Sequence, residues 1–339
     1  MAHFNNGLTV AGDISLNAIA ASIHSGVIVK AIIYDSSRDS DGGAWRKRCA
    51  DKSWYTETLG GTAWMGGAAT TAAAWALPGA DVGCVFQNTT DKKFYSLTGT
   101  STASEVFRGI SREFPEQVAI VVEAARVVIY DVTAPGCPMW MSFVGGASNW
   151  INTSMLWNFS LSSVCALNAK IVCCHANAGG PAVITLDFIS DSAISKTSNV
   201  SYGGRYSGNL ALRNSTTGYY LNGVGSTGYS IIPNAMVNDV AITVLDGAPI
   251  DPATGLPVPT IFVGTAGGLS TITNLGTVTN STSTVSVTKC VANGSKLTTV
   301  RSDGVVSTWA DTTTIAVAPD TTYTASSTPA VLGTVTVAA

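Results

Sequence analysis

The sequence has 339 residues, of which 46% are hydrophobic and only 12% are charged, about half of the ~25% charged residues that soluble domains usually carry. The 18 basic and 21 acidic residues give a formal net charge of −3. This composition excludes a disordered chain, and it disfavours a duplex nucleic-acid binder because no basic excess is present. No stretch of about 18 consecutive apolar residues occurs, so the sequence predicts no membrane insertion.

Residues 1–26 are predicted to form an extended N-terminal arm. Asn5-Asn6-Gly7 is a turn signal, and residues 8–10 have the pattern of a short strand. The N-terminus lacks a basic segment followed by an apolar one, so we expect no secretory signal peptide. We therefore expect synthesis in a reducing cytoplasm, with free thiols at the seven cysteines.

Residues 27–339 are predicted to form one all-β body. Runs of apolar and β-branched residues recur at intervals of roughly 35 to 55 residues, and several are followed by a polar turn and a second strand. The runs comprise residues 27–34, 82–86, 118–122, 170–174, 210–212, 260–263 and 297–300. Paired strands that repeat in this way are typical of the blades of a β-propeller.

Units of roughly 45 residues would fill the body about six to seven times. We therefore expect a β-propeller-like fold of about six to seven small antiparallel blades. If these blades do not close the ring, a partner or a swapped segment would complete it. A β-sandwich or several separate β domains would produce the same hairpins and remains the alternative.

The sequence contains no recognisable catalytic or cofactor motif. It has no GxSxG, P-loop or HExxH pattern, and its three histidines do not combine with other ligands at metal-binding spacing. Asp35, Asp39 and Asp41 lie in a loop that faintly resembles a calcium site, but Arg46 stands where the closing Glu would be. We therefore predict no enzyme activity, no cofactor and no metal.

Aromatic and basic residues are most concentrated in Trp45-Arg46-Lys47-Arg48 and in Trp54-Tyr55. Arg and Trp are enriched at the energetically important positions of protein interfaces, so these six residues are the candidate protein-interaction site. The alternative interpretation is an edge strand that charge protects from unwanted pairing.

Seven segments of the sequence carry a resemblance to known proteins. They are IYD (33–35), DGGAWRKR (41–48), SWYTETL (53–59), SREFP (111–115), VVIYD (127–131), PMWMSF (138–143) and FVGTAGGLS (262–270). These segments resemble virion structural proteins of marine tailed bacteriophages, most firmly over residues 28–145. The resemblance implies an architectural role in a propeller-like protein and carries over no active-site residue. Such proteins often continue into a lectin-like domain.

The resemblance leads us to expect a non-enzymatic structural protein of the phage tail, at a nozzle, a hub or a fibre base. Its partners would be other phage structural proteins and further copies of itself. It would be made in the cytoplasm of the bacterial host and located in the virion. One alternative is a module that binds host-surface glycans through Trp150, Trp157, Tyr202 and Tyr206. A less favoured alternative is a polysaccharide-cleaving propeller enzyme.

Such an enzyme would need carboxylates and arginines that converge at the centre of the propeller. The candidate arginines are Arg126, Arg205, Arg213 and Arg301, which belong to different units of the repeat.

Overall fold

The computed structural model describes residues 2–3, 9–10, 24, 26–146, 154–157, 160–176, 182–198, 204–215, 218, 220–222, 231–273, 276–310, 319 and 321–324. All structural statements below concern these residues.

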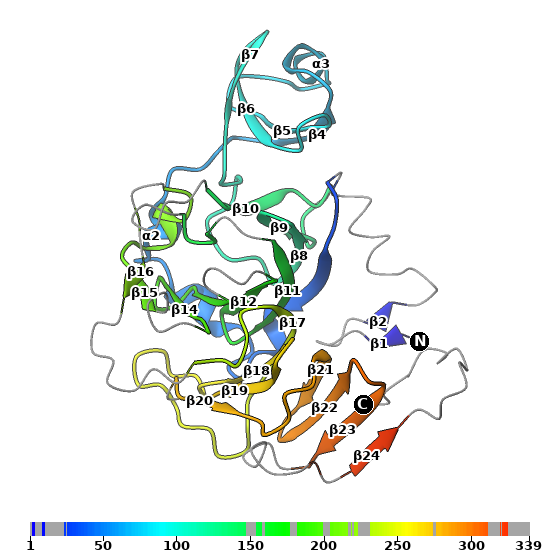
Figure 1. Ribbon diagram of the computed structural model, residues 1–339. Coiled ribbons are helices and arrows are strands. Elements are labelled where there is room, and N and C mark those ends of the chain that lie inside the picture. Colours follow the sequence, from blue (N-terminus) through cyan, green and yellow to red (C-terminus); the bar gives the residue numbers. More distant parts are fainter. Residues whose placement is uncertain are drawn as a thin grey trace.

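Four antiparallel sheets follow one another along the chain (Figure 1), and we call them the first to fourth blades. The first contains β3 (Lys30–Asp35), β8 (Gln117–Glu123), β9 (Arg126–Asp131) and β10 (Met139–Val144). The second contains β11 (Leu161–Leu167), β12 (Lys170–His175), β13 (Val183–Asp187), β14 (Ser192–Lys196), β15 (Gly204–Tyr206) and β16 (Tyr220–Asn222). The third contains β17 (Val237–Thr243), β18 (Thr260–Thr265), β19 (Gly268–Ile272) and β20 (Val278–Asn280). The fourth contains β21 (Val287–Asn293), β22 (Lys296–Arg301), β23 (Val305–Trp309) and β24 (Thr321–Thr324).

The first strand of each blade lies against the first strand of the next blade. β3 contacts β11, β11 contacts β17, and β17 contacts β21, so we call these four the inner strands. Apolar side chains fill the space between the faces of successive blades. Small antiparallel sheets that start at a shared centre and stack face to face have the arrangement of a propeller, so the predicted all-β, β-propeller-like fold is confirmed.

The hairpin between β11 and β12 illustrates why the chain turns where it does. The two turn residues, Asn168 and Ala169, have φ values of 50° and 62°. Positive φ at both central residues is the geometry of a type I′ turn, whose twist matches that of the two strands. The Asn168 side chain also donates to Ser40 Oγ and to the carbonyl oxygen of Pro257, both at 3.0 Å, and so fixes two loops to this hairpin.

A long insertion separates β3 from β8 within the first blade. It contains the 3-10 helices η1 (Ser36–Arg38) and η2 (Ala44–Arg48), the helix α2 (Ser53–Thr56) and a separate sheet. The strands of this sheet are β4 (Trp64–Ala68), β5 (Val85–Asn88), β6 (Phe94–Gly99) and β7 (Thr102–Glu105), and the helix α3 (Thr71–Trp75) packs against them.

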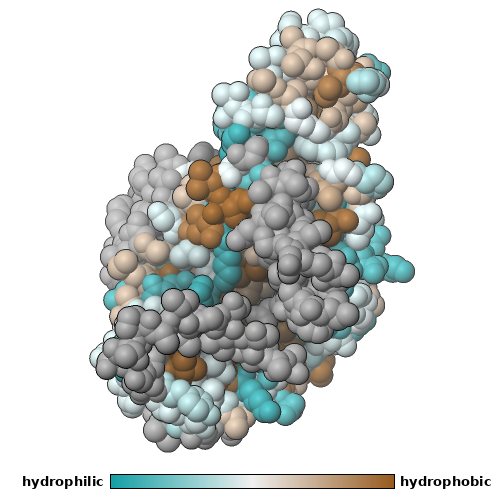
Figure 2. Space-filling view, turned by 90° about the vertical axis from the view of Figure 1, so that its right-hand side faces the viewer, coloured by the Kyte–Doolittle hydropathy of each residue, from teal (hydrophilic) through white to brown (hydrophobic). Residues whose placement is uncertain are grey.

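We call residues 61–106 the lobe, and we call residues 57–60 and 107–110 its two linkers. The lobe projects from the body at the top of Figure 1 and remains a distinct upper part of the surface in Figure 2. Within it, β4 and β5 are parallel, whereas the other strand pairs are antiparallel. The lobe was not anticipated from the sequence.

The number of blades differs from the expected six to seven. The described residues supply four blades, and the strand expected at 82–86 contributes to β5 in the lobe instead. Residues 210–212 form the 3-10 helix η3 (Leu210–Leu212) rather than a strand, because Asn209 Oδ1 accepts from Leu212 N and caps the turn.

The described part of the predicted N-terminal arm contains a two-stranded sheet. β1 (Ala2–His3) pairs with β2 (Thr9–Val10) in antiparallel fashion, and the predicted turn between them lies outside the described residues. All seven cysteines are described, and each is a free thiol. Among the described residues, no helix has the length and apolar character needed to cross a membrane.

Candidate functional site: the junction between the lobe and the body

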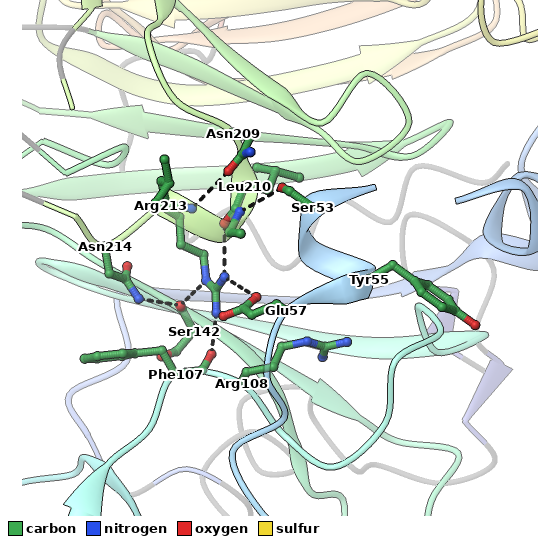
Figure 3. Close-up of polar contacts among 12 residues, drawn as sticks. Ser53, Tyr55, Glu57, Phe107, Arg108, Ser142, Asn209, Leu210, Arg213 and Asn214 are labelled. Carbon is green, nitrogen blue, oxygen red and sulfur yellow. Dashed lines mark hydrogen bonds and ion pairs between the residues drawn. The ribbon is translucent and has the colours of Figure 1, made fainter. Parts of the chain in front are cut away.

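One guanidinium group, that of Arg213, joins both linkers of the lobe to the body (Figure 3). Arg213 Nε donates to the carbonyl oxygen of Ser142 in β10 at 2.9 Å, and Nη2 donates to the carbonyl oxygen of Phe107 at 2.8 Å. Nη1 lies 2.8 Å from Glu57 Oε2 and 3.0 Å from the carbonyl oxygen of Leu210. The Arg213 side chain is 1% exposed, so these bonds replace its contacts with water.

Two further arginines donate to backbone carbonyl groups at the same junction. Arg108 Nη1 donates to the carbonyl oxygen of Trp140 at 2.7 Å, and the guanidinium carbon lies 4.2 Å from the centre of the Trp140 ring. Burial lowers the pKa of Arg108 to about 9, so the group remains charged at neutral pH. Arg112 Nη1 donates to the carbonyl oxygens of Tyr55 and Glu57. Together with Arg213, these side chains hold linker backbone at fixed positions.

Two glycines allow the linkers to approach each other and the first blade. Gly60 N donates to the carbonyl oxygen of Gly109 at 3.4 Å, and Gly109 N donates to the carbonyl oxygen of Trp140 at 2.9 Å. A Cβ atom on Gly60 would lie 1.9 Å from the carbonyl oxygen of Arg108, and one on Gly109 would lie 2.0 Å from that of Met139. Any larger residue at either position would therefore force the backbone apart.

The base of the lobe packs on the outer face of the first blade. Phe94 and Val85 of the lobe are buried in one apolar cluster with Tyr130 of β9, and the Phe94 and Tyr130 ring centres are 6.2 Å apart. Trp64 Nε1 donates to the carbonyl oxygen of Gly136 at 3.0 Å. The lobe is thus fixed by polar bonds at its linkers and by apolar contacts at its base.

One stretch of the lobe carries no charge. Residues 61–80 include no Asp, Glu, Lys or Arg, and the charged residues of the lobe are Asp81, Asp91, Lys92, Lys93 and Glu105. Val82, which follows the uncharged stretch, is 56% exposed. The surface of the lobe in Figure 2 is correspondingly pale to brown, with few strongly hydrophilic residues. Depletion of charge is a feature of surfaces that contact other proteins, so the lobe is the candidate interaction surface.

Two residues of the predicted interaction site lie in the core instead. Trp45 in η2 and Trp54 in α2 are fully buried. Trp45 Nε1 donates to Asp39 Oδ2 at 2.7 Å, and its ring centre lies 5.0 Å from that of Phe114. Trp54 Nε1 donates to the carbonyl oxygen of Phe188 at 2.8 Å. The prediction is therefore wrong for Trp45 and Trp54, because neither presents a surface to a partner.

The other four residues of that predicted site lie closer to solvent. Lys47 and Arg48 are exposed, whereas Arg46 and Tyr55 are half-buried. Arg46 Nη2 lies 3.3 Å from Glu116 Oε2, and Arg48 Nη2 donates to the carbonyl oxygen of Thr254. The six residues therefore do not form one surface, and an interaction role for these four stays a prediction.

The aspartates considered for calcium make structural contacts. Asp35 Oδ1 accepts from Ser37 N at 3.0 Å and caps η1, and Asp41 Oδ2 lies 2.8 Å from Arg48 Nη2. Asp39 is buried and accepts the hydrogen bond from the Trp45 indole described above. Within the described ranges, no group of three or more His, Cys, Asp and Glu residues is placed to hold a metal ion.

Two of the four aromatic residues proposed for glycan stacking lie among the described residues, and both are buried. Trp157 is 4% exposed and Tyr206 is 1% exposed, so both rings pack inside the protein. Trp150 and Tyr202 lie outside the described residues.

The arginines proposed for a catalytic funnel bind different partners. Arg126 donates to the carbonyl oxygen of Lys92, Arg213 is held at the lobe junction, Arg301 pairs with a neighbouring aspartate, and Arg205 is exposed on β15. The structure therefore does not bring these four side chains to one site.

Neither a known protein-family model nor a curated protein matches this chain. Solved structures with some similarity include BBS1N in complex with ARL6DN, at 13% identity and a TM-score of 0.32, with 71% of this chain and 61% of that chain covered. Kluyvelomyces marxianus Hsv2 matches at 10% identity and a TM-score of 0.27, over 66% of this chain and 62% of that one. The β-propeller domain of Myceliophteria thermophila Cps50 (Swd1) matches at 13% identity and a TM-score of 0.27, over 57% and 61%. The chain thus spans less than two thirds of each of these structures.

Proposed function

We propose that this chain is a non-enzymatic structural protein of a bacteriophage virion, located in the tail, which acts through protein–protein contacts. The observation that carries the proposal is the lobe, which has no charged residue between positions 61 and 80 and which Arg213 and Glu57 hold to the body. A rigidly held, sparsely charged projection suits a part that must occupy a fixed place in a larger assembly.

The chemistry of the buried polar groups also favours a structural role. At the lobe junction, the arginines donate to backbone carbonyl groups and to Glu57, so their donors stabilise the fold. The Asp39 carboxylate is likewise occupied by the indole of Trp45 and by the backbone N–H of Asn168. Groups used in this way are not free for acid–base or nucleophilic chemistry.

The proposal is tested by removing the lobe from the full chain. Residues 62–106 are replaced by a short Gly-Ser linker, which the 3.4 Å contact between Gly60 N and the Gly109 carbonyl oxygen allows. Phage particles are then produced with the full chain, with the shortened chain or with an Arg205→Ala control, and their protein content and infectivity are measured.

We expect the full chain and the Arg205→Ala variant to enter mature particles. The shortened chain should keep a cooperative thermal unfolding transition but should leave particles incomplete and without infectivity. Absence of the full chain from purified particles would refute the virion role. Normal particles with the shortened chain would refute the role of the lobe.

A further inference from the structure

The inner strands of successive blades are joined by a repeated hydrogen bond. β11, β17 and β21 each have a register shift after their first residue, which places Ser162, Asn238 and Thr288 at equivalent bulge positions. Ser162 Oγ donates to the carbonyl oxygen of Val237 at 2.7 Å, and Asn238 Nδ2 donates to that of Val287 at 2.9 Å. In both cases the bulge residue binds the first residue of the next inner strand.

The residues after the bulges form a second series of contacts. Lys30 Nζ in β3 donates to Ser163 Oγ at 2.8 Å, and Ser163 Oγ donates to Asp239 Oδ1 at 2.7 Å. Asp239 Oδ2 accepts from Cys290 N in β21 at 3.1 Å. This series therefore runs from the first blade to the fourth through one side chain of each intermediate blade.

Both series stop at the fourth blade. Thr288 Oγ1 donates to the carbonyl oxygen of Val300 within its own blade, at 3.0 Å. The side chain of Lys289, which occupies the position of Ser163 and Asp239, is exposed and makes no hydrogen bond or ion pair with another described residue, although its positive charge helps to lower the pKa of Asp239 in the preceding blade. The fourth blade thus carries polar side chains at the two positions that bind a following blade in the second and third blades.

The outward face of the fourth blade is also less covered than the equivalent face of the third. In the third blade this face consists of Ala241, Phe262, Leu269 and Thr271, which are at most 8% exposed because the fourth blade packs on them. The strand registers place Val291, Thr298, Val306 and Thr308 at the equivalent positions of the fourth blade, and all four are half-buried.

The charge of this blade indicates what could cover it. The strands β21 to β24 contain Lys289, Lys296 and Arg301 but no Asp or Glu. Arg301 pairs with Asp303 in the turn after β22, so Lys289 and Lys296 carry the positive charge that matters for this face. A second copy that presented the same blade would bring like charges together, which is unfavourable. The outer face of the first blade is no substitute, because Phe94 and Val85 of the lobe already pack there.

We propose that the outward face of the fourth blade binds a β-sheet of a different protein, and that a carboxylate on this sheet pairs with Lys289. The sheet takes the place of a fifth blade, and the Thr288 hydroxyl turns away from the Val300 carbonyl oxygen to donate to a backbone carbonyl group of this sheet. The interface would continue the two series of contacts that already join the blades of this chain.

The test uses the full chain in the cells that naturally produce it, with a photo-reactive benzoylphenylalanine at Val291 or Val306. After irradiation, cross-linked peptides are identified by mass spectrometry in chains that also carry Lys289→Glu, Lys289→Ser or the matched control Lys296→Glu. Thermal unfolding of each variant shows whether the chain still folds. Lys289→Ser serves as the second variant if the charge reversal disturbs folding.

We expect both positions to cross-link to one strand segment of another protein that contains Asp or Glu. Lys289→Glu should reduce the yield at least about tenfold, Lys296→Glu should leave it unchanged, and exchange of the partner's acidic residue for Lys should restore it with Lys289→Glu. The proposal is overturned if the cross-links join residues of this chain or of a second copy, if none form, or if the yield does not depend on Lys289.

Discussion

Lys30 Nζ lies 2.6 Å from Asp239 Oδ1, although 209 positions separate the two residues in the sequence. The contact joins the first blade to the third across the inner strand of the second. Asp239 is 4% exposed, and burial by itself would raise the pKa of its carboxyl group. The charge of Lys30 and the hydrogen bonds from Lys30 and Ser163 outweigh this effect, so the pKa of Asp239 lies below its usual value.

This shift predicts how the stability of the protein depends on pH. Since the pKa of Asp239 is lower in the folded than in the unfolded chain, its contribution is complete above the unfolded value of about 3.9 and is lost as the pH falls through the folded value. Asp239→Asn should therefore reduce the free energy of unfolding by about 1–3 kcal/mol at pH 7. Below about pH 4 the difference from the wild type should shrink.

Urea denaturation between pH 3 and pH 7 measures this difference. Asp246→Asn is the control, because Asp246 is an exposed loop residue that should contribute little at any pH. A deficit in Asp239→Asn that stays constant down to pH 3 would contradict the assigned pKa shift.

Arg213 is predicted to keep the lobe in a fixed orientation. Arg213→Ala should reduce the free energy of unfolding by about 3–5 kcal/mol, because Glu57 and several carbonyl groups lose a buried partner. Arg213→Lys should rescue only part of the loss, since an ammonium group cannot bind all of these acceptors at once. Limited proteolysis within residues 107–110 should become faster in both variants. The exposed Arg205 gives the control variant Arg205→Ala, and equal proteolysis in Arg213→Ala and in this control would refute the role.

The two linker glycines are predicted to tolerate no side chain. Gly60→Ala would place Cβ 1.9 Å from the Arg108 carbonyl oxygen, so the linker must move and the free energy of unfolding should fall by about 1–3 kcal/mol. Gly146→Ala is the matched control, since the nearest atom to its Cβ would be 3.5 Å away. Thermal unfolding distinguishes the two variants, and equal transition temperatures would show that the linkers are not held in close contact.

The sequence predicted two hairpins of the blades because their signals are local. Apolar runs joined by short polar turns indicate antiparallel hairpins, and β18–β19 and β22–β23 follow this pattern. The same pattern cannot show where a hairpin packs. The strand expected at 82–86 therefore looked like part of a blade, although β5 lies in the lobe, and the insertion also explains why the repeat is irregular in length.

The candidate site could not be predicted from the sequence for a related reason. Glu57 and Arg213 are 156 positions apart, and no local motif links a carboxylate to an arginine over that distance. The predicted interaction site contains Trp45 and Trp54, which lie in helices of five and four residues. Elements this short have no apolar periodicity, so the sequence could not distinguish buried from exposed aromatic side chains there.

The position of Trp54 leads to a final prediction about stability. Trp54→Ala should reduce the free energy of unfolding by about 3–5 kcal/mol, because it removes ring contacts with Trp140 and Phe188 and leaves the Phe188 carbonyl oxygen without its indole donor. Lys47→Ala, which changes an exposed residue of the same predicted cluster, should alter the stability by no more than about 0.5 kcal/mol. Urea denaturation followed by tryptophan fluorescence measures both variants. A stable Trp54→Ala protein with impaired binding to its partners would instead support an interface role for this residue.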